Sequence, residues 1–222
     1  MINSDGTCKK LHYRLADSIR FNNVGLPKEA LSRKYYEKHP KEGIKKLDEP
    51  LHFDTLYDII NESEYQSTPS NSILFHFRLF DWLSWPHAGK VLIDDCLKIV
   101  KDNQILITNM DCVCIVYGGC GNNEEDKRKT DEFIDTFVEQ VKQFNTDIRI
   151  LNSENTDQDF KYMMTAEYFV PSVGGYSTLA AAVSKNNVLW ELSDRYYDEY
   201  KSNNEKTHVK MFKEHYLSQK KS

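Results

Sequence analysis

The sequence lacks long apolar runs and an excess of positive charge. None of its 222 residues belongs to an apolar run near the ~18 residues that span a bilayer. Its first ten residues, MINSDGTCKK, contain no signal-peptide core. The net charge is −5, so no broad basic surface is available for nucleic acid or anionic membranes. We therefore expect no membrane span, no nucleic-acid partner and a cytoplasmic location.

Cysteines are few and do not form a metal or disulfide framework. The five are Cys8, Cys96, Cys112, Cys114 and Cys120, and no two of them have the Cys-x-x-Cys spacing. A structural zinc site needs four well-placed ligands, which this spacing does not provide. We expect buried, reduced thiols and a reducing compartment.

Hydrophobic residues make up 40% of the chain and charged residues 28%, which is typical of a folded globular domain. From residue 71 onward, short apolar segments alternate with segments of helical periodicity. The predicted strands are 72–78, 113–117, 148–151, 168–170 and 188–192, and the predicted helices are 91–100, 129–144, 157–165 and 176–183. This alternation predicts an α/β fold, with a Rossmann-like, doubly wound parallel sheet.

The turn cluster Ser-Thr-Pro-Ser-Asn at 67–71 marks the best domain boundary. We expect 1–69 to be a small, mostly helical region and 70–195 to be the Rossmann-like domain. The remaining segment, 196–222, is predicted to be a helical tail that packs back over the sheet.

Three predicted strand ends carry residues suited to chemistry. The first has His76, Arg78 and Asp81 directly after an apolar run. Polar clusters at the carboxyl ends of strands bind ligands in open α/β sheets, and a guanidinium offers a planar fork of donors to a diphosphate. The alternative is a surface ion pair between Arg78 and Asp81.

The second strand end leads into a turn of glycine and hydroxyl residues. The turn spans Ser172 to Thr178, and its candidate site residues are Gly174, Gly175, Tyr176, Ser177 and Thr178. Glycines allow close approach of a ligand, and hydroxyls with free amides at a helix start form an anion site. The sequence is neither a Walker loop nor a GxGxxG fingerprint, and a plain helix cap is the alternative.

The third strand end contains Ser153 and Glu154, which could accept hydrogen bonds from a ribose or a base edge. Asp157 and Asp159 follow, and a pair of this kind can hold a divalent metal. Because Asp is also favoured at a helix start by capping and by the helix dipole, we expect no metal here.

Two of these segments resemble the fucosyltransferase superfamily: α1,2- and α1,6-fucosyltransferases, protein O-fucosyltransferases and their bacterial and viral relatives. Its first motif is a strand followed by His-x-Arg-x-x-Asp, and 73–81 is similar to it. Its last motif is an acidic residue opening a helix, a strand, a Ser/Gly-rich turn with an aromatic, and a small-residue helix. Asp159 through Ala182 is similar to that pattern. The resemblance covers about residues 71–192.

The resemblance implies half of a GT-B fold and an inverting, metal-independent transfer of sugar from a nucleotide sugar to a glycan acceptor. A GDP-fucose-like donor is favoured, with no further cofactor. The implied diphosphate ligands are Arg78, Tyr176, Ser177 and Thr178. The residues implied to flank the nucleoside are His76, Ser153 and Glu154. The resemblance favours bacterial or viral glycan assembly over a Golgi enzyme.

Several points stay open from the sequence. The glutamate used as base in one branch of the family would fall near Pro86, so Asp81 or His87 would serve as base. Residues 1–69 are too few for a second Rossmann-like half, so the acceptor side is either a helical cap, another domain or a second subunit. His12–Asp17 repeats the His-x-Arg-x-x-Asp spacing without a good strand, which makes Arg14 the second candidate arginine.

Two further function classes remain compatible with the sequence. One is another α/β enzyme that modifies a nucleotide sugar without an acceptor. The other is a non-catalytic Rossmann-like interaction domain, in which the polar strand ends are only caps and turns.

Overall fold

The computed structural model contains a five-stranded, all-parallel sheet with the strand order β3-β2-β1-β4-β5. It describes residues 57–58, 60–79, 83, 88–118, 124–153, 156–172, 175–194 and 203–220. The strands are β1 (Ser72–Arg78), β2 (Cys112–Gly118), β3 (Ile148–Ile150), β4 (Tyr168–Val170) and β5 (Asn187–Val188). The predicted α/β class and parallel sheet are therefore confirmed.

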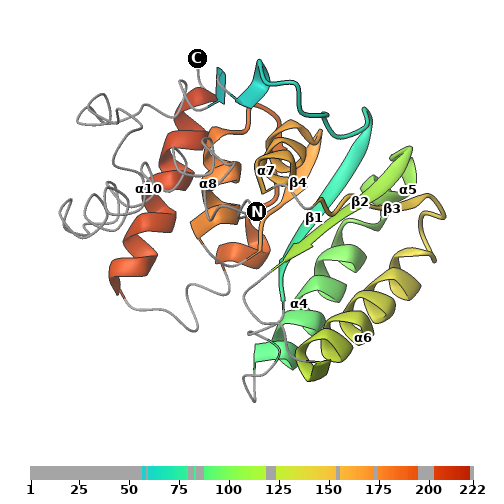
Figure 1. Cartoon of the computed structure of the whole chain (residues 1–222). Helices are drawn as coiled ribbons and strands as arrows, with labels where there is room; N and C mark the ends of the chain where they lie inside the picture. Colours follow the sequence, from blue (N-terminus) through green and yellow to red (C-terminus); the bar gives the residue numbers. More distant parts are fainter. Residues whose placement is uncertain are drawn as a thin grey trace, which may run out of the picture.

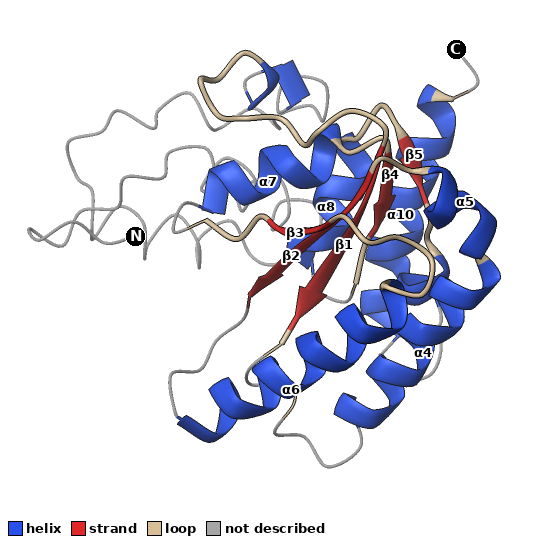
Figure 2. Ribbon diagram, turned by 90° about the vertical axis from the view of Figure 1, so that its right-hand side faces the viewer, coloured by secondary structure: helices blue, strands red, loops and turns tan. Residues whose placement is uncertain are grey.

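Helices cover both faces of the sheet (Figure 1). One face carries α4 (Ala88–Asp102), α5 (Gln104–Asn109) and α6 (Glu124–Val141). The other face carries α7 (Thr156–Thr165), α8 (Gly175–Val183) and α10 (Asn203–Gln219). The view in Figure 2 shows the sheet between these two layers.

The central strand β1 is buried on both sides, which explains its continuous apolar run. Phe75 and Phe77 point to the α4–α6 layer, where both rings make edge-to-face contacts with Phe137 at 5.0 and 4.8 Å. Leu74 points to the opposite layer and packs with Phe160 of α7. All five side chains are at most 1% exposed. Aromatic packing on one side and mixed packing on the other thus hold β1 at the centre of the sheet.

The strand order reverses between β1 and β4. The chain adds β2 and then β3 on one side of β1, and α7 carries it back to β4 on the other side. In such sheets the crevice between the two strands at the reversal, at their carboxyl ends, is where ligands bind. This places the ends of β1 and β4 at the position of interest.

The C-terminal helix α10 packs against α8. The hydroxyl of Tyr216 accepts a hydrogen bond from the Val188 N–H (3.0 Å) and donates one to the Asn186 carbonyl (2.9 Å). Gln219 donates to the Ala182 carbonyl at the end of α8 (3.2 Å). The helix therefore covers the outer edge of β5.

Several elements differ from the predictions. The predicted strand 188–192 is wrong beyond Leu189, whose N–H makes the last hydrogen bond to β4 (2.8 Å, to Phe169 O). Residues 191–194 turn helical because β4 offers no further partner. Helix α6 begins at Glu124 and not near residue 129, since its first turn is acidic and favours the helix dipole. Helix α5 was not predicted.

Three cysteines, Cys96, Cys112 and Cys114, are buried free thiols, as expected. Burial and the neighbouring Cys112 raise the pKa of Cys114 to about 12, so this thiol is inert at neutral pH. Cys8 and Cys120 lie outside the described residues. No helix in the described part of the chain is long and apolar enough to cross a membrane.

Candidate functional site

The site begins where the β1–β4 ladder ends. The last paired residues are Phe75 and Val170. The N–H of Leu79 donates to Gly118 O in β2 (2.8 Å), and successive amides of a strand alternate in direction, so the N–H of Arg78 faces the β4 side. There the hydroxyl of Ser172, two residues after β4, accepts it at 3.2 Å. A side chain thus continues the hydrogen bonding where the strand has stopped.

The same hydroxyl holds His76, whose Nδ1 lies 3.1 Å from Ser172 Oγ. His76 is only 7% exposed, and burial together with the charge of Arg78 lowers its pKa to about 3. The imidazole is therefore neutral at physiological pH. Because Ser172 Oγ accepts the Arg78 N–H and has no other acceptor among the described residues, its proton goes to Nδ1. His76 then carries its own proton on Nε2.

A further hydrogen bond joins Ser172 to the start of α8. The Ser172 N–H donates to the hydroxyl of Ser177 (3.0 Å), and both serines are 0% exposed. The ring of Tyr176 lies edge-on to His76, with centroids 6.3 Å apart, and also contacts Phe160 at 5.4 Å. The first turn of α8 is therefore fixed against the end of β1.

This arrangement suits an anion. Arg78 is partly buried at the end of β1, and the first turn of α8 has amides with no partner inside the helix. A helix N-terminus and the guanidinium of Arg78, whose main chain is linked to that helix through Ser172, both favour negative charge. The buried hydroxyl of Ser177 is used to hold the turn, so we assign it to positioning the site. Thr178 is likewise 0% exposed.

The third predicted strand end, after β3, also lies at the carboxyl ends of the strands but at a different place along the sheet. Asp159 Oδ1 accepts the N–H of Ser153 (2.9 Å), and Asn152 Oδ1 accepts the N–H of Tyr117 (2.7 Å). These bonds join the loop after β3 to α7 and to the end of β2. Because β2 separates β3 from β1, this loop is one strand removed from the carboxyl ends of β1 and β4.

The structure brings together His76, Arg78, Tyr176 and Ser177, which the sequence had placed on two separate strand ends. Gly175 is the first residue of α8. The predicted site residues outside the described part of the chain are Asp81, His87, Glu154 and Gly174, together with the alternative Arg14. Ser172 is the first residue of the polar turn 172–178 singled out in the sequence, but no role of its own was predicted for it.

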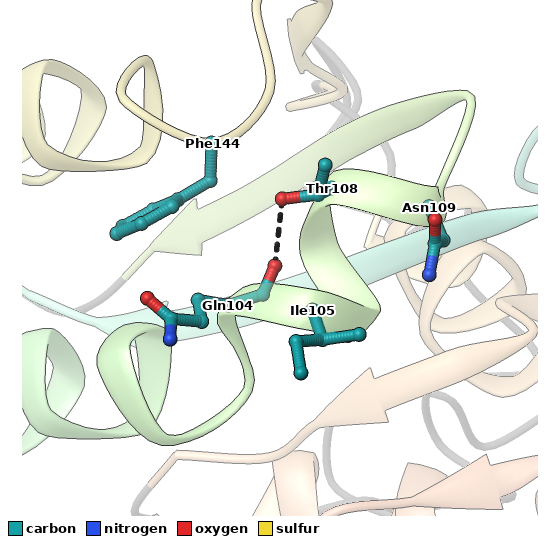
Figure 3. Close-up of a pocket in the computed structure, with 5 residues that line it drawn as sticks. All are labelled: Gln104, Ile105, Thr108, Asn109 and Phe144. Carbon is teal, nitrogen blue, oxygen red and sulfur yellow. Dashed lines mark hydrogen bonds between the residues drawn. The ribbon is translucent and has the colours of Figure 1, made fainter.

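A separate hollow of about 250 Å³ lies at the opposite, amino end of the sheet (Figure 3). It is lined by Gln104, Ile105, Thr108, Asn109 and Phe144, which come from α5 and the loop before β3. Its side chains are open to solvent, with Ile105 at 75% exposure. The hollow is therefore separate from the carboxyl ends of β1 and β4.

Comparison of the chain with known proteins does not identify a family. The chain matches no protein-family model, no curated protein and no solved structure. Within the described ranges, no group of three or more His, Cys, Asp or Glu side chains is placed to hold a metal. Any functional conclusion therefore rests on the hydrogen bonds at the carboxyl ends of β1 and β4 and on the sequence motifs.

Proposed function

We propose that the carboxyl ends of β1 and β4, together with the first turn of α8, bind the diphosphate of a nucleotide sugar and that the protein is a glycosyltransferase. The observation that carries the proposal is the junction of Arg78 with the first turn of α8 through Ser172. Both groups favour an anion, and they lie at the strand-order reversal where α/β sheets bind nucleotides.

A diphosphate suits this site better than a single carboxylate. The helix start offers several amides in a row, and the guanidinium offers parallel donors, so one ligand with several anionic oxygens can use both. His76 is neutral and adds no charge. Its Nε2–H is a hydrogen-bond donor without a partner in the described structure, and we assign it to an oxygen of the same ligand.

The resemblance to fucosyltransferases narrows the reaction. In the proposed step an acceptor hydroxyl attacks the anomeric carbon, and the bond from that carbon to the diphosphate oxygen breaks. The nucleoside diphosphate leaves with the electron pair, stabilised by Arg78 and the α8 dipole without a metal. The hydroxyl proton passes to Asp81 or His87, and the sugar carbon is inverted. GDP-fucose is the favoured donor and a glycan the acceptor, with the sheet as one half of a GT-B architecture.

Calorimetric titration with GDP and with UDP, in the presence of EDTA, tests the proposal. We expect saturable binding that the R78A substitution weakens at least about tenfold, as loss of a charged hydrogen bond requires. Arg149→Ala is the matched control, because Arg149 is an exposed arginine paired with Asp147 on β3. Equal effects of the two substitutions would contradict the assignment of Arg78.

Turnover separates the remaining function classes. A transferase transfers fucose from GDP-fucose to a glycan and hydrolyses the donor only slowly alone. Fast conversion of a nucleotide sugar without an acceptor would favour a sugar-nucleotide-modifying enzyme. No thermal shift with any nucleotide would favour an interaction domain.

A further inference from the structure

One buried hydroxyl joins three parts of the site. We define the Ser172 clamp as the hydrogen bonds of Ser172 Oγ with His76 Nδ1 and the Arg78 N–H, and of the Ser172 N–H with Ser177 Oγ. We infer that Ser172 is a positioning residue, which aligns Arg78 with the first turn of α8 so that both act on one ligand. The inference rests on the proposed function of the site at the carboxyl ends of β1 and β4.

The Ser172 clamp lies beyond the point where main-chain hydrogen bonds between β1 and β4 end. The β1–β4 ladder stops at Phe75 and Val170, while Arg78 lies three residues further along. On its other side Arg78 stays in register with Gly118 of β2, so its distance from β2 is set by the sheet. Its distance from α8 is set by Ser172. Ligand-binding groups need placement within about 0.5 Å, and a hydrogen-bonded buried hydroxyl provides that.

His76 completes the clamp because it orients the hydroxyl. A serine hydroxyl has one proton and can rotate, so an acceptor is needed to direct it. Neutral Nδ1 is that acceptor, and the oriented oxygen then presents a lone pair to the Arg78 N–H. Asn at position 76 would keep a polar acceptor near the place of Nδ1, whereas Leu would not. His76→Asn should therefore retain more of the clamp than His76→Leu.

A second buried serine offers a matched control. Ser184, directly after α8, is also 0% exposed; its hydroxyl donates to Met164 O (3.1 Å) and accepts the Asn186 N–H (3.2 Å). It forms as many hydrogen bonds as Ser172 Oγ but lies at the other end of α8. Removal of either hydroxyl costs stability, and only removal of the Ser172 hydroxyl disturbs Arg78.

The first experiment measures GDP affinity by calorimetry for S172A, S184A, R78A and the double variants. We expect S172A to weaken GDP binding about fivefold to tenfold, the range of one lost hydrogen bond, and S184A to leave it unchanged. R78A should cost at least threefold less affinity in the S172A background than in the wild type, since a misaligned guanidinium contributes less. Additive losses, or equal losses in S172A and S184A, would overturn the inference.

The second experiment needs no ligand. Amide hydrogen exchange of Arg78, followed by NMR, should accelerate at least about tenfold in S172A and not in S184A. The Leu79 amide, which bonds to Gly118 O, is the internal reference and should stay protected. An unchanged Arg78 amide would overturn the clamp. Absence of GDP and UDP binding in the wild type would overturn the proposed function instead, and the exchange result would still decide the inference.

Discussion

Ser172 and Ser184 flank the same helix and differ in what they hold. Both are fully buried, and each hydroxyl makes two hydrogen bonds. Ser184 bonds only to main-chain groups, at the amino end of the sheet. Ser172 bonds to a titratable side chain and to the amide of an arginine, at the carboxyl end. The comparison teaches that burial and satisfied hydrogen bonds do not by themselves distinguish the two serines, and that their hydrogen-bond partners do.

The largest expected difference between the carboxyl and amino ends of the sheet is in the stability of the folded protein at acidic pH. His76 has a pKa of about 3 in the folded protein, below the ordinary value of 6.5, so only the unfolded chain gains its proton between these values. Stability from this group is complete above pH 6.5 and falls as the pH approaches 3, by about 3 to 5 kcal/mol in all. Urea unfolding at several pH values measures it.

His76→Asn is the variant that isolates this effect, because it removes the titrating group and keeps a polar side chain beside Ser172. Its stability should depend less on pH below 6.5 than that of the wild type. S184A should keep the full acid dependence. A wild-type slope retained by His76→Asn would assign the acid sensitivity to other groups.

Next in size is the loss of each buried hydroxyl. S172A leaves the buried Nδ1 of His76 and the Arg78 N–H without their partner, and S184A leaves Met164 O and the Asn186 N–H. We expect each to lower the free energy of unfolding by about 1–3 kcal/mol at pH 7. Chemical denaturation checks this. A much larger loss for one of them would show that their burial is not equivalent.

Tyr216 holds the segment next to Ser184, since its hydroxyl bonds to the main chain of Asn186 and Val188. Tyr216→Phe should lower the free energy of unfolding by about 1–2 kcal/mol, measured in the same way. It should leave GDP affinity unchanged, because it acts at the amino end of the sheet. Weakened GDP binding would mean that the two ends of α8 are coupled.

The smallest effect is expected at an exposed hydroxyl. Thr108 Oγ1 donates to Gln104 O (2.8 Å) at the rim of the hollow in Figure 3, but the side chain is exposed. Water replaces the lost partner, so Thr108→Ala should change the free energy of unfolding by less than about 0.5 kcal/mol. A larger loss of unfolding free energy would show that the Thr108 hydroxyl stabilises the protein although it is exposed.

The sequence predicted the fold well where periodicity was strong. The apolar run of β1 indicates a buried strand, and the stripe of Phe133, Phe137 and Val141 indicates an amphipathic helix at α6. Both patterns can be recognised from neighbouring residues alone. The strand beginning at Val188 was predicted too long, because its length depends on where β4 ends. That is a tertiary property, which apolar content alone does not encode.

The site was predicted in part. Strand-end chemistry pointed to Arg78 and to the turn before Ser177, and the structure places these two segments next to each other. That they meet depends on β1 and β4 being neighbours, which the order of segments in the chain does not specify. The hydrogen bonds of Ser172 depend on this neighbourhood as well, so the sequence could place Ser172 in the polar turn but could not reveal its partners.

The hydroxyl of Tyr216 has a consequence for the sheet as a whole. By donating to Asn186 O and accepting the Val188 N–H, it supplies what a neighbouring strand would supply, so β5 has no free edge at this position. Unpaired strand edges are templates for association with other chains. Helix α10 therefore keeps a further strand from pairing with β5. Any variant that detaches α10 would expose an unpaired strand edge and favour self-association of the protein.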